Sequence, residues 1–230
     1  MYFPQQIPIF AFYFPHTKAN NKNMRGFHTF TFDEVEKMFG IREVDTLPLL
    51  AEWLQAVANI DEYQRYDLVR LKNRLLKKAV IWQEDEFKMF FIGPLIEIAE
   101  ISTDLFQPFT QRSFSFVHNE EKIGGRVDFF IAKGRRLPEL PYFCIHEYKQ
   151  EADSSGEPIG QLLIAMVAAQ SLNETKFPII GAYVIGRSWF FIVLDGKEYA
   201  KSDAYIASSE DIFQIFAILQ KSKEIIQRFV

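Results

Sequence analysis

The strongest constraint on the fold comes from two short apolar runs, residues 124–132 and 142–149, which a polar loop with two prolines separates. Both runs are rich in β-branched and aromatic residues, the types that strands favour. Two such runs joined by a short loop predict a β-hairpin. We therefore expect the rest of the chain to be organised around these two strands.

Charged residues interrupt the apolar pattern of each predicted strand. Side chains alternate between the two faces of a strand, so Glu147 and Lys149 share the face of Ile145, and Asp128 shares the face of Phe130. If the strands pair antiparallel with these faces aligned, Asp128, Glu147 and Lys149 converge. Charges on an apolar face are costly unless they are paired or bound to a ligand. The group is therefore either a functional site or a salt bridge at the end of a strand.

The three residue types have a chemical use in common. Two carboxylates suit a hard cation such as Mg²⁺, which binds one or two protein carboxylates and keeps several waters. A bound divalent metal acidifies water and neutralises a phosphoryl oxygen. A nearby lysine can orient the attacking water or offset developing charge. The residues Asp128, Glu147 and Lys149 supply these parts.

An Asp in one strand followed by Glu-x-Lys in the next resembles the PD-(D/E)XK nuclease-like superfamily, also called restriction-endonuclease-like. The matching residues are Asp128 and Glu147-Tyr148-Lys149, and the resemblance covers roughly residues 88–195. The order of predicted elements, αβββαβ, also fits. The three-residue signature is loose by itself, and the residues before Asp128 are Gly-Arg-Val in place of a proline.

The resemblance implies a metal-dependent enzyme that hydrolyses phosphodiester bonds in nucleic acid, with DNA favoured. It implies that Asp128 and Glu147 bind Mg²⁺ or Mn²⁺ and that Lys149 positions the attacking water. A glutamate on the preceding helix would complete the metal site, and we expect Glu97 because it lies in an apolar stretch. Gln161, at the start of the following helix, would point into the site. Two alternatives stay open: Glu97 is a solvated surface residue, and Gln161 forms a hydrogen bond at the end of its helix.

Several arginines are candidates for contact with a phosphodiester backbone. Arg126, Arg135 and Arg136 lie close to the site in sequence, and Arg70 and Arg74 share one side of a helix predicted over residues 61–80. A solvated outer face is the other interpretation of the basic helix, since charge is expected on the outer side of an amphipathic helix. The net charge of −4 argues against non-specific coating of nucleic acid, which needs a basic surface, but not against a local basic groove.

We expect one α/β domain over residues 1–230, with a restriction-endonuclease-like core at 86–200: a mixed central sheet flanked by helices. An N-terminal arm and helical region, 1–85, and a C-terminal helix within 201–230 would pack on this core. Further helices are predicted at 33–39, 48–59, 61–80, 86–106, 158–171 and 210–229. Further strands are predicted at 114–118, 178–185, 189–194 and 197–200.

The remaining features exclude some classes of protein. A single cysteine, Cys144, excludes an intramolecular disulfide and fits a reducing, cytoplasmic location. No signal peptide or membrane-spanning run is visible, and phosphate-loop, Gly-x-Ser-x-Gly and zinc-type motifs are absent. A nuclease-like binding or regulatory module with little turnover is the alternative function. Pairing as a homodimer stays open, as does binding of a protein partner by the N-terminal helical region.

Overall fold

The computed structural model describes residues 24–151, 158–173 and 176–230. Its strands are β1 (Met24–Gly26), β2 (Arg42–Glu43), β3 (Gln107–His118), β4 (Glu121–Lys133), β5 (Glu139–Lys149), β6 (Ile179–Ile185), β7 (Ser188–Asp195), β8 (Glu198–Lys201) and β9 (Tyr205–Ile206). Its α-helices are α1 (Phe32–Phe39), α2 (Pro48–Leu54), α3 (Glu62–Lys78), α4 (Glu84–Phe87), α5 (Gly93–Ala99), α6 (Pro158–Leu172) and α7 (Asp211–Gln227). A 3₁₀ turn η2 (Phe27–Thr29) and a π-helical turn η3 (Lys88–Ile92) complete the described elements.

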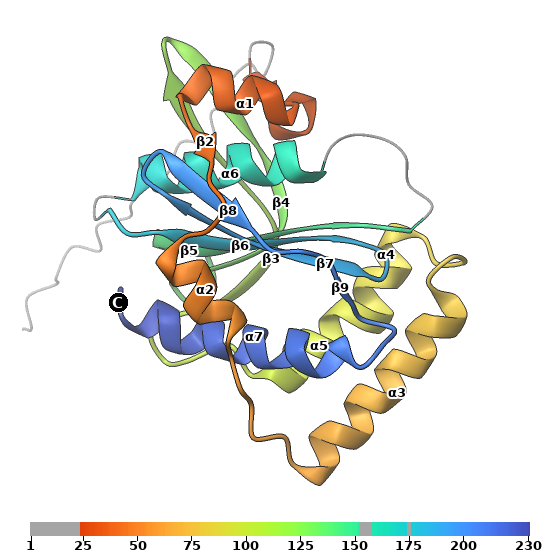
Figure 1. The fold of residues 1–230 in the computed structure, drawn as a ribbon. Coiled ribbons are helices and arrows are strands. Elements are labelled where there is room, and N and C mark those ends of the chain that lie inside the picture. The colour runs from red at the N-terminus through yellow and green to blue at the C-terminus, as the bar shows by residue number, and fades with distance from the viewer. Residues whose placement is uncertain (1–23, 152–157, 174–175) are drawn as a thin grey trace, which may run out of the picture.

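The strands form one mixed sheet between two layers of helices (Figure 1). The order of strands is β1-β4-β5-β6-β7-β8-β2, with β3 paired to β4 and β9 paired to β7. β3, β4 and β5 run antiparallel, whereas β5 and β6 run parallel and are joined through α6. The expectation of a mixed α/β fold with helices on both faces of a mixed sheet is confirmed.

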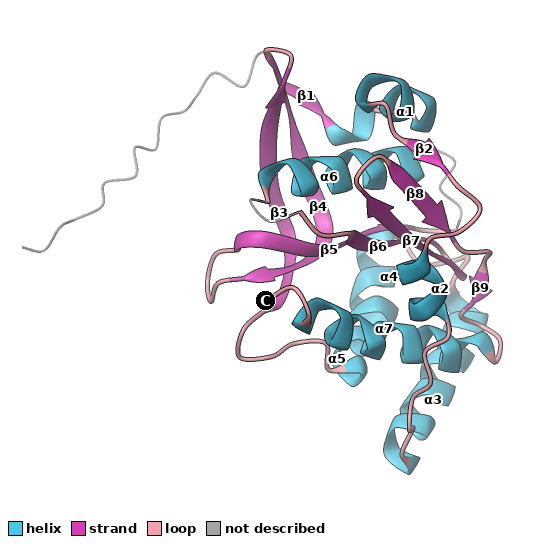
Figure 2. Cartoon of the chain, turned by 60° about the vertical axis from the view of Figure 1, so that its left-hand side comes forward, coloured by secondary structure: helices cyan, strands magenta, loops and turns pink. Residues whose placement is uncertain are grey.

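Each face of the sheet has its own helices. Helices α1 and α6 cover one face, and α2, α5 and α7 lie across the other, with α3 and α4 beside them (Figure 1). Figure 2 shows the long β3–β4 hairpin running past α6 towards β1. The helical layer that carries α4, η3 and α5 is the one that matters for the site, because it approaches the sheet beside β4 and β5.

Local sequence signals explain where several helices begin and end. Thr31 caps α1 and forms a capping box with Glu34, and Gly40 ends the helix with a left-handed φ of 60°. Asp61 caps α3 in the same way, together with Gln64. The predicted limits of these two helices are therefore confirmed to within two residues.

The helix expected over residues 86–106 is wrong in both extent and form. The chain passes from α4 through the π-helical turn η3 into α5, and Glu100 ends α5 with a left-handed φ of 50°. Residues 107–118 form β3, so the strand expected at 114–118 begins seven residues earlier. The helix expected at 48–59 ends at Leu54.

The buried apolar residues form one continuous core. Helix α6 is apolar all round because it lies between the sheet and the segment from η2 to α1, where a Cβ at Gly160 would come 2.5 Å from the Phe30 carbonyl oxygen. On the other face, Trp53 of α2 is fully buried and donates a hydrogen bond to the Ile218 carbonyl of α7 at 2.8 Å. The N-terminal arm expected over the first residues, 1–23, lies outside the described residues.

None of the helices in the described ranges combines the length and the apolar character needed to cross a membrane.

Candidate active site between β4 and β5

The register of β4 and β5 brings the predicted charged group together. Phe130 pairs with Ile145 and Phe129 with His146 in an antiparallel ladder, so the next opposed positions are Asp128 and Glu147. Lys149 follows on the same face, and its Nζ lies 3.3 Å from Oε1 of Glu147. The structure therefore places Asp128, Glu147 and Lys149 at one point of the sheet, as the alternation of the two strands predicts.

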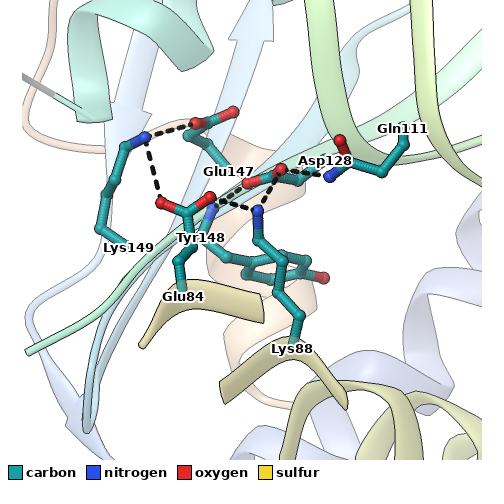
Figure 3. A network of polar contacts seen from close by, with 7 residues as sticks. All are labelled: Glu84, Lys88, Gln111, Asp128, Glu147, Tyr148 and Lys149. Atoms are coloured by element: carbon teal, nitrogen blue, oxygen red, sulfur yellow. Dashed lines mark hydrogen bonds and ion pairs between the residues drawn. The ribbon is translucent and has the colours of Figure 1, made fainter. Parts of the chain in front are cut away.

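Asp128 is the centre of the polar contacts (Figure 3). Its Oδ2 accepts a hydrogen bond from the backbone N–H of Tyr148 at 2.9 Å. Its Oδ1 accepts from Nε2 of Gln111 at 2.7 Å and from Nζ of Lys88 at 2.5 Å. The side chain is only 10% exposed, so these contacts satisfy a carboxylate that is nearly removed from water.

Gln111 reaches Asp128 because β3 is distorted there. Thr110 and Arg112 pair with Phe129 and Val127, but Gln111 interrupts this ladder with a left-handed φ of 53°. A non-glycine residue in this conformation is strained by about 1–3 kcal/mol, and such residues cluster at functional sites. Sequence reasoning missed Gln111, because nothing in the pattern of β3 indicates a left-handed residue.

Two further charged residues enter the site from the helical layer. Glu84 of α4 and Lys88 of η3 lie one helical turn apart and form an ion pair of 2.5 Å. Glu84 also lies 3.5 Å from Nζ of Lys149, so it joins the two lysines (Figure 3). Sequence reasoning missed both. A lone lysine inside the apolar run at 87–92, four residues after a glutamate, is the signal that was available.

Burial and charge set the protonation of this group. Burial, and then the neighbouring Asp128 carboxylate, raise the pKa of Glu147 to about 8. For Lys149, burial acts to lower the pKa, but the Glu147 and Glu84 carboxylates outweigh it and the pKa rises. The same balance, with Asp128 and Glu84 as partners, raises the pKa of Lys88. Both lysines are therefore cations at neutral pH, whereas Glu147 holds a proton.

A cavity of about 420 Å³ opens beside Asp128. One wall is apolar and comes from η3, α5 and the start of β3, and the polar end holds Lys88, Gln111 and Asp128. The other lining residues are Asp85, Met89, Ile92, Gly93, Ile96, Pro108, Thr110, Phe129 and Tyr148. The carboxylate at the centre of the site is thus accessible to a small group from one side.

The structure does not bring Glu97 to this site. Glu97 is exposed and lines a different, smaller cavity together with Glu100 and Lys223. The π-helical turn η3 precedes it and adds a residue to the helical repeat, which rotates the faces of α5 relative to α4. Glu84 is the glutamate of this helical segment that reaches the site, so the expectation for Glu97 is corrected.

Gln161 lies in the first turn of α6 and is half-buried. Helix α6 packs on the face of the sheet to which Glu147 points, since Met166 lies over Gly181, the partner of Ile145 in β6. No described contact joins Gln161 to Asp128, Glu147 or Lys149. Its role in the site stays a prediction.

The arginines expected to contact nucleic acid are exposed but lie in different places. Arg126 lies on β4, two residues before Asp128. Arg135 and Arg136 lie in the β4–β5 loop beyond Lys133, which ends β4 five residues and so roughly 17 Å from Asp128. On α3, Arg70 pairs with Asp67 at 2.9 Å, and Arg74 donates to the Phe90 carbonyl of η3 at 3.2 Å.

The residues between the charged ones point to the opposite face and belong to the core. Nδ1 of His146 lies 2.7 Å from the Tyr148 hydroxyl, and its Nε2 lies 3.2 Å from Sγ of Cys144. Burial lowers the pKa of His146 to about 3, so this histidine is neutral at physiological pH. Burial raises the pKa of the Cys144 thiol, which makes it a poor nucleophile, as expected for a core cysteine.

The fit of these residues to a divalent cation depends on a pair of carboxylates. Among the described residues, no group of three or more histidine, cysteine, aspartate or glutamate side chains is arranged to hold a metal ion. Mg²⁺ needs only one or two protein carboxylates, however. Glu147 is buried and the side chain of Asp128 is only 10% exposed, and the Asp128 carboxylate disfavours ionisation of Glu147. A divalent cation held by the two would favour the ionised form of Glu147. The donor chemistry therefore fits Mg²⁺ or Mn²⁺, with the Lys88 ammonium as a cation already on Asp128.

No protein-family model matches the chain, and neither does any curated protein sequence. The function proposed below therefore depends on this chain's own residues and on their resemblance to a known type of site.

Proposed function

We propose that this protein is a metal-dependent phosphodiesterase that acts on nucleic acid, with DNA as the first substrate to test. The observation that supports it best is the antiparallel register of β4 and β5, which brings Asp128 to the Tyr148 backbone beside Glu147, with Nζ of Lys149 3.3 Å from Oε1 of Glu147. The order α5-β3-β4-β5-α6-β6 is the αβββαβ arrangement expected of a restriction-endonuclease-like core, and we propose that core for this chain.

The charge and burial of each site residue indicate its role in the proposed reaction. Asp128 and Glu147 would bind the divalent cation, and Glu84 lies close enough to the two lysines to balance their charge. A bound Mg²⁺ or Mn²⁺ would neutralise charge at a phosphoryl oxygen and would acidify a water. Lys149 stays protonated, because its pKa is raised, and it therefore stabilises negative charge and does not act as a general base.

A nucleic-acid substrate fits the surroundings of the site better than a small phosphodiester does. The exposed Arg126 lies on the same strand as Asp128, and Arg74 on α3 contacts the π-helical turn that carries Lys88. Two exposed arginines therefore lie on elements that border the site, and a protein that follows a nucleic-acid backbone uses such side chains to contact phosphates. The acidic net charge of −4 limits such a surface to the neighbourhood of the site.

The experiment that tests the proposal measures cleavage of labelled single-stranded and duplex DNA and RNA with Mg²⁺, with Mn²⁺ and with a chelator. Wild type is compared with Asp128→Asn, Glu147→Gln and Lys149→Met. We expect metal-dependent cleavage that each substitution lowers by about a hundredfold or more, since each removes a metal ligand or a group that stabilises the transition state.

A matched control exists for Asp128. The Asp211 carboxylate also accepts a backbone hydrogen bond, from Ile206 N at 2.8 Å, but it lies at the start of α7 outside the site. Asp211→Asn should leave cleavage unchanged. If no substrate is cleaved and calorimetry detects no binding of Mn²⁺ at millimolar concentration, the proposal is wrong.

A second candidate function, a nuclease-like module that binds nucleic acid with little turnover, is favoured by one specific contact. The Lys88 ammonium lies 2.5 Å from Oδ1 of Asp128, on an oxygen that a metal would otherwise use. Retention of nucleic acid in a mobility-shift assay, without cleavage under any metal condition, would favour this second candidate.

A further inference from the structure

Lys88 occupies an unusual position for a residue of a proposed metal site. Its ammonium lies 2.5 Å from Oδ1 of Asp128 and 2.5 Å from Oε1 of Glu84, and its side chain is only 17% exposed. The carboxylate pair of the site therefore already has a cation on its more accessible member. In Figure 3 the lysine rises from the helical layer directly towards Asp128.

The charges of the cluster explain what this cation does. When Glu147 is ionised, as a metal ligand has to be, Glu84, Asp128 and Glu147 carry three negative charges and the two lysines carry two positive ones. With Lys88 withdrawn, the three carboxylates face the single charge of Lys149. Two negative charges then remain, which is the complement of one divalent cation. The ammonium of Lys88 and a divalent ion are thus alternatives at Asp128, because both together would leave an excess of positive charge in a partly buried site.

Lys88 also has a place into which it can withdraw. It lines the cavity of about 420 Å³ beside Asp128, which the exposed side chain of Met89 also lines. A lysine has four rotatable bonds, so its ammonium can leave Asp128 without any movement of the helix backbone. It comes from the π-helical turn η3, and such turns are frequent at functional sites.

We infer that Lys88 is an internal competitor for the metal site, which holds Asp128 until a divalent cation displaces its ammonium into the adjoining cavity. This inference rests on the proposed function and adds a control of that same site. It predicts that the protein binds divalent metal weakly, because each binding event has to break the contacts of Lys88 with Asp128 and Glu84.

The test is calorimetric titration with Mn²⁺ alone, without nucleic acid, on wild type and on Lys88→Met. We expect Lys88→Met to bind Mn²⁺ about tenfold or more tightly, within the range typical of coupling between two binding events. Lys88→Arg keeps a cation at this position and should stay near the wild-type affinity. In the double variant Lys88→Met with Asp128→Asn the tight binding should be lost, which assigns it to this site.

A matched control separates competition from a general change of charge. Lys72 of α3 is also mostly buried, with 18% of its side chain exposed, and it pairs with Glu210 away from the site. Lys72→Met removes the same charge and should leave the affinity for Mn²⁺ unchanged. Thermal melts of each variant show that the titrated samples are folded. Lys88→Gln, which also removes the charge, replaces Lys88→Met if that variant is unstable.

The outcomes are distinct. Tighter Mn²⁺ binding by Lys88→Met than by wild type supports the inference. Equal or weaker binding by Lys88→Met overturns the inference while the proposed function stands, because wild type still binds metal. Absence of binding at millimolar Mn²⁺ in both proteins overturns the proposed function and the inference with it.

Discussion

The carboxylate of Asp128 accepts the backbone N–H of Tyr148 at 2.9 Å, where the backbone pairing of β4 and β5 has ended at Phe129 and His146. The Asp128 side chain of β4 thus takes the place of a backbone carbonyl as the acceptor for this N–H of β5. The same residue is the proposed metal ligand. Asp128 therefore has a structural role that substitution can separate from its chemical one.

Replacing Asp128 should reveal this structural role in the free energy of unfolding. Asp128→Ala leaves the Tyr148 N–H without an acceptor and Lys88 without its main partner, and should cost about 3 kcal/mol. Asp128→Asn keeps an acceptor for Tyr148 and should cost about half as much, although it removes the charge. Urea denaturation at pH 7 measures both. Equal losses would show that the hydrogen bond to Tyr148 contributes little.

Glu147 should make the protein less stable as the pH rises. Its pKa is about 8 in the folded protein, against about 4.3 for an unfolded glutamate. Between these values the folded protein retains a proton that the unfolded chain has released, so the free energy of unfolding falls as the pH increases and levels off above about 8. We expect a loss of about 3 kcal/mol between pH 5 and pH 8 from this residue.

Comparison with Glu147→Gln isolates the contribution of Glu147 from those of other titrating groups. Glutamine keeps the neutral form at every pH, so the variant should lose less stability than wild type over the same range. Urea denaturation of both proteins at pH 5, 6.5 and 8 gives the difference. Parallel curves for the two proteins would contradict the raised pKa.

The convergence of Asp128, Glu147 and Lys149 could be predicted because it depends on local rules alone. The period of two in a strand fixes which side chains share a face, and a short connection between two strands makes them antiparallel neighbours. The helices predicted at 33–39 and 61–80 depend on similarly local rules, since Thr31 and Asp61 cap the helices found there. None of these predictions needed knowledge of tertiary packing.

The rest of the site depends on packing that the sequence pattern does not contain. Glu84 and Lys88 lie about forty residues before Asp128, and only the docking of α4 and η3 against the sheet brings them to it. Glu97 was a wrong choice because one continuous helix was assumed, whereas a π-helical turn changes the faces beyond Ile92. Gln111 has a left-handed backbone, so the alternation of side chains along β3 does not hold at the residue that contacts Asp128.

Gly160 should tolerate no larger side chain. It lies in the first turn of α6, and a Cβ there would come within 2.5–2.9 Å of backbone atoms of Phe30, Thr31 and Phe32, which cannot move aside easily. Gly160→Ala should therefore lower the free energy of unfolding by about 2 kcal/mol or more, despite the better helix propensity of alanine. Ser171→Ala, on an exposed position of the same helix, should change stability by less than about 0.5 kcal/mol. Urea denaturation distinguishes the two.

Binding of metal should release a proton from Glu147. At pH 6.5 this carboxyl is protonated, because its pKa is about 8, and a metal ligand has to be ionised. The affinity for Mn²⁺ should therefore rise about tenfold for each pH unit up to about 8 and change little above it. Calorimetry at pH 6.5 in buffers of different ionisation enthalpy should count nearly one proton released per metal bound. Metal that binds without proton release, or with the same affinity at pH 6 and pH 8, would show that Glu147 is not a ligand and that the raised pKa belongs to a structural ion pair with Lys149.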